Sequence, residues 1–266
     1  MTTDWLAICR AAVEDVRGVL VELPTRAERE PVVGAGKGGD DTVAIDAAAE
    51  AAIVRRLEAT GGEFTLISEE LGERAFGSEG ATHVVVDPID GSLNAKRGIP
   101  FFALSVAVAD GATMDDVHFG YVYDFGTGEE WTAERGRGAF LSGERLGAVK
   151  PKERIEILSF EATLTSSVAE KAAQMVGIAY RLRIMGSLAL SLCHLAAGRV
   201  DAVCSLKGAR SVDIAAAQLL VRECGLAIDL PEAPPFGQAP LDTEGRSRVV
   251  AAGTPALCKE LFAALS

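Results

Sequence analysis

Apolar residues recur along this chain with the spacings of alternating helices and strands. From Trp5 to Leu23 they return at intervals of three and four, which predicts a helix that Pro24 ends. A glycine-rich loop from 34 to 39 follows and ends at Asp40-Asp41. We expect Asp46 to open an alanine-rich helix that runs to about residue 57.

The rest of the chain continues this alternation of short apolar runs and helical spacing. The run at 83–86 is continuously apolar, which is typical of a strand buried on both faces. The pattern predicts layers of helices and sheets, with a division near residue 145 between an N-terminal half (1–145) and a C-terminal half (146–266). The predicted strands are 64–67, 83–86, 102–109, 119–123, 130–132, 155–160, 202–204, 226–228 and 249–252, and the further helices are 168–176, 187–197, 212–224 and 255–265.

Composition narrows the class of protein. A hydrophobic content of 48% with 24% charged residues is that of an ordinary globular chain. The net charge of -12 disfavours a nucleic-acid partner, because an acidic surface repels the phosphate backbone. Five cysteines without a C-x-x-C pair predict free buried thiols, and neither a signal peptide nor an apolar run of ~20 residues is found. We therefore expect a cytoplasmic protein with no membrane partner.

Two aspartates three residues apart follow the buried run at 83–86. The segment reads Asp87-Pro-Ile-Asp90-Gly-Ser92, in which proline and glycine are expected to form a turn. Their carboxylates, with the carbonyl of Ile89, are the hard oxygen ligands that Mg²⁺ and similar cations prefer. Taken alone, the segment is more typical of an ordinary aspartate-rich turn than of a metal site.

Further acids stand at the ends of predicted elements. Glu69 and Glu70 follow the strand at 64–67, whereas Asp46 and Asp213 begin helices. Strand ends and helix starts are where an α/β fold places its binding site. The alternatives are a solvated charge pair for the glutamates and helix capping for the aspartates.

These motifs together resemble the inositol monophosphatase family, over roughly residues 40–253. The family carries a Glu-Glu pair, then D-P-I-D-G-[ST], then a downstream Asp followed by two alanines, which here is Asp213-Ile-Ala-Ala216. The resemblance implies an α/β fold, the layered αβαβα sandwich of the sugar-phosphatase superfamily, and a homodimer. It also implies Mg²⁺-dependent hydrolysis of a small phosphorylated polyol or sugar by metal-activated water.

The resemblance also assigns roles to residues. Two or three Mg²⁺ ions are expected on the acids, and the attacking water is expected near Asp46 and Ser92. The implied sets are catalytic Asp46, Glu69 and Ser92; metal-binding Glu69, Asp87, Ile89, Asp90 and Asp213; and substrate-binding Asp90, Gly91, Ser92, Arg183, Gly186 and Arg210.

The sequence differs from the animal inositol monophosphatases at positions that bear on the expected substrate. Val212 stands where those enzymes have tryptophan, and no acid matches the one that contacts inositol hydroxyls. The segment around Arg210 resembles the archaeal-type branch, whose members act on inositol 1-phosphate and fructose 1,6-bisphosphate. Arg183 and Arg210 are candidates to bind substrate phosphate, or else form surface ion pairs. The alternative functions are a 3′-phosphoadenosine 5′-phosphate or histidinol-phosphate phosphatase and a non-catalytic sugar-phosphate-binding regulator.

Overall fold

The computed structural model describes residues 3–37, 41–77, 82–150, 152, 154–161 and 164–265. Asp40 of the predicted glycine-rich loop lies outside the described residues. The helices are α1 (Trp5–Glu22), α2 (Arg26–Arg29), α3 (Ala44–Glu58), α4 (Ser92–Arg97), α5 (Thr165–Ala172), α6 (Leu188–Ala196), α7 (Ser211–Glu223) and α8 (Pro255–Leu265), with 3-10 turns at Met114–Asp116, Ala173–Met175 and Phe236–Gln238.

The strands form two large sheets and one small hairpin. The hairpin pairs β1 (Val32–Ala35) with β2 (Asp41–Val43). The eight-stranded sheet has the order β10-β9-β8-β7-β6-β5-β3-β4, and the five-stranded sheet has the order β12-β11-β13-β15-β14. Their strands are β3 (Phe64–Ser68), β4 (Gly72–Phe76), β5 (His83–Asp90), β6 (Ala103–Ala109), β7 (Val117–Asp124), β8 (Glu130–Glu134), β9 (Gly138–Leu141), β10 (Glu144–Arg145), β11 (Ile155–Glu161), β12 (Ala179–Arg183), β13 (Ala202–Ser205), β14 (Ala227–Asp229) and β15 (Val250–Ala252).

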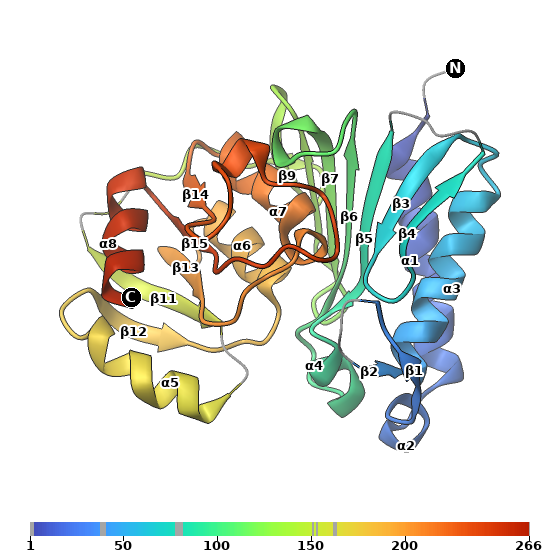
Figure 1. The fold of residues 1–266 in the computed structure, drawn as a ribbon, viewed down its shortest axis with the longest axis horizontal. Coiled ribbons are helices and arrows are strands. Elements are labelled where there is room, and N and C mark those ends of the chain that lie inside the picture. Colours follow the sequence, from blue (N-terminus) through green and yellow to red (C-terminus); the bar gives the residue numbers. More distant parts are fainter. Residues whose placement is uncertain are drawn as a thin grey trace.

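Helices and sheets alternate in five layers (Figure 1). Helices α1 and α3 cover the outer face of the eight-stranded sheet, and α6 and α7 fill the space between the two sheets. Helix α8 packs on the outer side of the five-stranded sheet, on β14 and β15. This arrangement confirms the predicted α/β, αβαβα sandwich.

The central strands are buried because helices cover both faces of their sheet. Every residue of β6 is buried, and so is all of β5 after His83. Strands β3 and β5 are parallel, whereas the other neighbours in this sheet are antiparallel. The eight-stranded sheet ends at Arg145, and the five-stranded sheet begins at Ile155. All five cysteines are buried and free.

Several predicted boundaries were wrong, each for a local reason. The strand at 83–86 continues as β5 to Asp90, because a bulge between Asp87 and Asp90 lets its pairing with β6 go on through the motif. Helix α3 begins at Ala44, so Asp46 lies in its first turn rather than at its start. The helix predicted at 168–176 is α5 at Thr165–Ala172 followed by a 3-10 turn.

Short elements are the ones that the pattern missed, namely the β1–β2 hairpin, β9, α2, α4 and the edge strands β4, β10 and β12. The central residues of β4 are exposed, and β12 mixes exposed and half-buried positions. A strand with little buried surface carries neither the continuous apolar run nor the alternation on which a prediction depends.

Candidate active site

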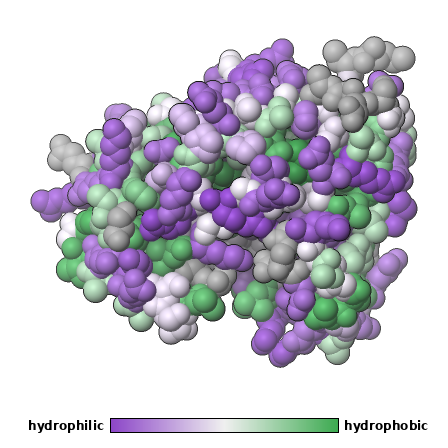
Figure 2. All heavy atoms as spheres, in the orientation of Figure 1, coloured by the Kyte–Doolittle hydropathy of each residue, from purple (hydrophilic) through white to green (hydrophobic). Residues whose placement is uncertain are grey.

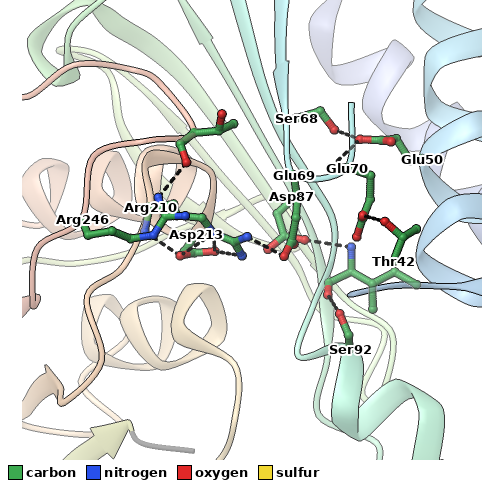
Figure 3. Close-up of polar contacts among 12 residues, drawn as sticks. Thr42, Glu50, Ser68, Glu69, Glu70, Asp87, Ser92, Arg210, Asp213 and Arg246 are labelled. Atoms are coloured by element: carbon green, nitrogen blue, oxygen red, sulfur yellow. Dashed lines mark hydrogen bonds and ion pairs between the residues drawn. The ribbon is translucent and has the colours of Figure 1, made fainter. Parts of the chain in front are cut away.

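The five predicted acids reach one region from four different elements. Glu69 lies in the turn after β3, and Asp87 and Asp90 lie on the bulged end of β5. Asp46 and Asp213 come from the first turns of α3 and α7. Figure 3 shows Glu69 and Asp87 close together and the Arg210 guanidinium between Glu69 and Asp213, and Figure 2 shows hydrophilic side chains gathered along the middle of one face of the molecule.

The bulge in β5 orients the two motif aspartates. Asp87 Oδ1 accepts a hydrogen bond from the Ile89 amide at 3.0 Å. Asp90 Oδ2 accepts from the Ala189 amide at 2.7 Å and from the Ser187 hydroxyl. Asp90 therefore lies against the start of α6, where unpaired amides favour negative charge.

Burial raises the pKa values of these acids. Burial raises the pKa of Asp90 to about 7, against the hydrogen bond from Ser187. The pKa of Asp87 lies well above its ordinary value, first because of burial and then because of the Glu69 charge. The pKa of Glu69 is raised by burial in the same way, although Arg210 opposes the shift. The cluster therefore holds more negative charge than its surroundings stabilise.

Asp46 has a buried oxygen without a partner. Its Oδ1 makes no hydrogen bond to any described residue. Burial, followed by the charges of Glu69 and Glu70, raises its pKa to about 7. The Ser92 hydroxyl lies close enough to lower that pKa, and it donates to the Ile89 carbonyl at 3.0 Å.

Gly91 connects β5 to α4 in a conformation that other residues rarely adopt. Its φ is 92°, and a Cβ there would lie 3.0 Å from the carbonyl oxygen of Gly186 and 3.1 Å from that of Phe101. The absence of a side chain brings the Gly186 loop directly against the aspartate motif.

Arg210 lies inside the acid cluster. Its side chain is only 11% exposed, and its Nη1 lies 2.6 Å from Glu69 Oε1 while its Nη2 lies 2.9 Å from Asp213 Oδ1 (Figure 3). The contact with Glu69 is an ion pair rather than a well-directed hydrogen bond, because Nη1 has no hydrogen-bond partner among the described residues. The Arg210 amide also donates to Asp213 Oδ2 at 2.7 Å, as in a helix capping box.

Arg183 is placed differently. It ends the edge strand β12, is exposed, and donates from Nη1 to the Leu182 carbonyl at 2.9 Å. Gly186 follows three residues later with a φ of 87°, and a Cβ there would lie 3.0 Å from Asn94 Nδ2.

Two glutamates that position loops of the site were not predicted from the sequence. Glu50 accepts the Ser68 hydroxyl and the amides of Glu70 and Leu71, at 3.2 and 3.3 Å, and so fixes the turn that carries Glu69. The available signal was its position four residues after Asp46, on the same face of α3. 

Glu161 likewise fixes a loop, on the other side of the site. This buried carboxylate accepts the Gly186 amide at 2.9 Å and the Ser191 hydroxyl at 2.8 Å. It is the last residue of β11, one position beyond the predicted strand at 155–160, and no motif surrounds it. Nothing in the local sequence pointed to a contact 25 residues away.

The donor set fits a hard divalent cation. All the candidate ligands are oxygen atoms, one buried carboxylate oxygen lacks a partner, and Arg210 is the cation paired with two of the acids. Within the described part of the chain, no three acidic, histidine or cysteine side chains are grouped closely enough to hold a metal ion. The Arg210 guanidinium lies between Glu69 and Asp213. The described helices include none that is both long and apolar enough to cross a membrane.

A five-layer sandwich with acids at the end of a central strand is the arrangement expected of the α/β sugar phosphatases. The model of the Inositol monophosphatase family matches residues 5–265, and the chain belongs to that family. It is accordingly a phosphomonoesterase, of a family whose members generally depend on Mg²⁺.

Three similar proteins illustrate the range of the family. The fructose-1,6-bisphosphatase/inositol-1-monophosphatase of Methanothermobacter thermautotrophicus is 35% identical and covers 94% of this chain and 96% of its own. The protein named Nus factor SuhB of Escherichia coli is 36% identical and covers 74% of each chain. The solved structure of the MJ0109 gene product, an inositol monophosphatase-fructose 1,6 bisphosphatase, has a TM-score of 0.84 at 27% identity and covers 98% of this chain and 100% of its own.

Proposed function

We propose that this protein hydrolyses inositol 1-phosphate and fructose 1,6-bisphosphate with two or three Mg²⁺ ions. The observation that carries the proposal is the group of acids that α3, β5, α7 and the turn after β3 bring together around Asp87. Asp46, Asp87 and Asp90 are buried, and Glu69 and Asp213 are half-buried. Acids with raised pKa values at such a place are typical of a functional site. The bifunctional archaeal relative supports the choice of substrates.

The metal ligands in this proposal are the acids of the cluster. When bound, Mg²⁺ supplies positive charge that lowers the pKa of the attacking water and stabilises the leaving alkoxide. The residues that hold it are Glu69, Asp87, Asp90, Asp213 and the Ile89 carbonyl. Glu50 and Ser187 keep Glu69 and Asp90 oriented through the hydrogen bonds described above.

Asp46 and Ser92 act on the water. Asp46 Oδ1, which has no hydrogen-bond partner among the described residues, can accept a proton from it. Ser92 orients the same water through its hydroxyl, and Glu69 contributes its charge from the opposite side. Attack on phosphorus then forms the new P–O bond while the bond to the substrate oxygen breaks.

The phosphate is bound by backbone and by arginine. In this proposal the amides of Gly91 and Ser92, at the start of α4, bind it together with Asp90 and Gly186. The close approach of Gly186 to Gly91 supports this grouping. Arg183 and Arg210 provide guanidinium groups, which match the geometry of phosphate oxygens.

Phosphate release from a panel of monoesters tests the substrates. The panel is inositol 1-phosphate, fructose 1,6-bisphosphate, 3′-phosphoadenosine 5′-phosphate, histidinol phosphate and glycerol 2-phosphate, each with Mg²⁺ and with a chelator. Preference for the first two is expected. Activity confined to 3′-phosphoadenosine 5′-phosphate or histidinol phosphate would identify a different substrate for the same reaction. Binding of Mg²⁺ without any turnover would favour a non-catalytic sugar-phosphate-binding regulator.

The Asp90→Asn variant tests the site. We expect it to lose activity on every substrate and to remain folded, because one charged metal ligand is replaced by a neutral side chain of the same shape. Asp110→Asn is the matched control, since the Asp110 side chain is 65% exposed and lies outside the cluster. Wild-type turnover in Asp90→Asn would contradict the assignment.

A further inference from the structure

Arg210 shares its binding partners with the proposed metal ions. Its guanidinium lies within 2.9 Å of one oxygen of Glu69 and one oxygen of Asp213. These acids come from opposite sides of the site, one from the turn after β3 and the other from α7. The guanidinium therefore spans the position between two acids that the proposed function assigns to metal binding.

The guanidinium and a metal ion compete for the same oxygens. A lone pair of Glu69 Oε1 or Asp213 Oδ1 that faces the guanidinium cannot at the same time face a cation, and two positive charges on the same pair of carboxylates repel each other. Binding of a metal ion to these two oxygens is therefore favoured when the guanidinium leaves them.

The local geometry permits this exchange. Asp213 Oδ2 is held by the backbone amide of Arg210 at 2.7 Å, a contact that does not depend on the arginine side chain. Glu69 follows a turn that Glu50 fixes through the Glu70 and Leu71 amides. Both acids therefore stay in place when the long, flexible side chain of Arg210 moves away.

We propose that the Arg210 guanidinium and a divalent cation bind Glu69 and Asp213 in alternation. The arginine is an internal counter-ion that keeps the two acids together before metal binds and competes with that metal. Its release on metal binding then frees a guanidinium beside the site, where the proposed function needs a group for substrate phosphate. This inference rests on the metal-binding part of the proposed function and not on the identity of the substrate.

The test is calorimetric titration of Mg²⁺ into chelator-treated protein without substrate. Arg210→Met removes the competing charge and keeps much of the side-chain volume, so we expect Mg²⁺ to bind roughly tenfold more tightly, equivalent to about 1.4 kcal/mol. Arg210→Lys keeps a charge that can contact fewer oxygens, so its affinity should lie between the two. Arg222→Met is the matched control, because Arg222 lies on the same helix and pairs with Asp115 outside the cluster.

A second measurement does not depend on any variant. In crystals of the wild-type protein grown with Mn²⁺, the distance between Arg210 Nη1 and Glu69 Oε1 should exceed hydrogen-bond range, whereas it should stay near 2.6 Å in crystals grown with a chelator. Mn²⁺ on both acids with the guanidinium still in contact would overturn the proposal. So would equal or weaker Mg²⁺ affinity in Arg210→Met. Failure of wild type and Arg210→Met alike to bind Mg²⁺ would overturn the proposed metal site as well.

Discussion

The buried charge of Asp46 makes the stability of the metal-free protein depend on pH. Its pKa rises from an ordinary 3.8 to about 7, with burial as the main cause. Between these values the folded state binds a proton that the unfolded state releases, so stability falls as pH rises through this range. From pH 5 to pH 8 this single group lowers the free energy of unfolding by at most about 2.6 kcal/mol, since each pH unit is worth about 1.4 kcal/mol.

Replacement of Asp46 by asparagine removes that dependence. The variant should unfold at similar urea concentrations to wild type at pH 5, and at clearly higher concentrations at pH 8. Part of the gain is offset because the asparagine amide also needs a hydrogen-bond partner when buried. A net gain of roughly 1–2 kcal/mol at pH 8 relative to pH 5 is therefore expected.

The assay is urea unfolding followed by circular dichroism, with a chelator present at both pH values. Asp110→Asn serves as the control for loss of an exposed acid. The informative quantity is the change in stability between the two pH values, compared between variant and wild type. If Asp46→Asn loses as much stability as wild type from pH 5 to pH 8, the reasoning from burial is refuted.

Three further substitutions probe other parts of the site. Ser92→Ala should lower kcat by roughly a hundredfold with little change in KM, because the hydroxyl acts on the water rather than on substrate binding; an unchanged kcat would remove it from the mechanism. Gly91→Ala should lower the free energy of unfolding by about 1–3 kcal/mol, since its positive φ and the contacts with Gly186 and Phe101 leave no room for a Cβ; a urea midpoint equal to that of wild type would contradict this. Arg183→Ala should weaken binding of fructose 1,6-bisphosphate by roughly tenfold and of inositol 1-phosphate by less, as measured by KM, and equal effects would argue against a role at the second phosphate.

The sequence was most informative where burial and motif coincide. The apolar run before Asp87 and the acids after it could be predicted because a strand covered on both faces must be apolar, and because acids are costly there without a function. The same argument located Glu69 after β3. The alternation of such runs with helical spacing predicted layers of helices and sheets, whereas the particular αβαβα order came from the family resemblance.

Contacts between residues far apart in the chain could not be predicted from the sequence pattern. Arg210 was predicted as a surface or substrate-binding residue, and its ion pair with Glu69 joins positions 141 residues apart in the chain, which no local pattern records. Glu161 and Gly186 meet through a loop whose course depends on packing. Edge strand β12 was missed because its exposed positions need not be apolar.

Phosphate release measured against Mg²⁺ concentration tests the central claim most directly. Chelator-treated wild-type protein and the Asp87→Asn variant are assayed side by side with inositol 1-phosphate as Mg²⁺ is restored. The account predicts no release without metal, recovery of wild-type activity as Mg²⁺ is added, and no recovery in Asp87→Asn, because that buried acid is a proposed metal ligand. Full activity of the wild type in chelator, or equal recovery in the variant, would contradict it.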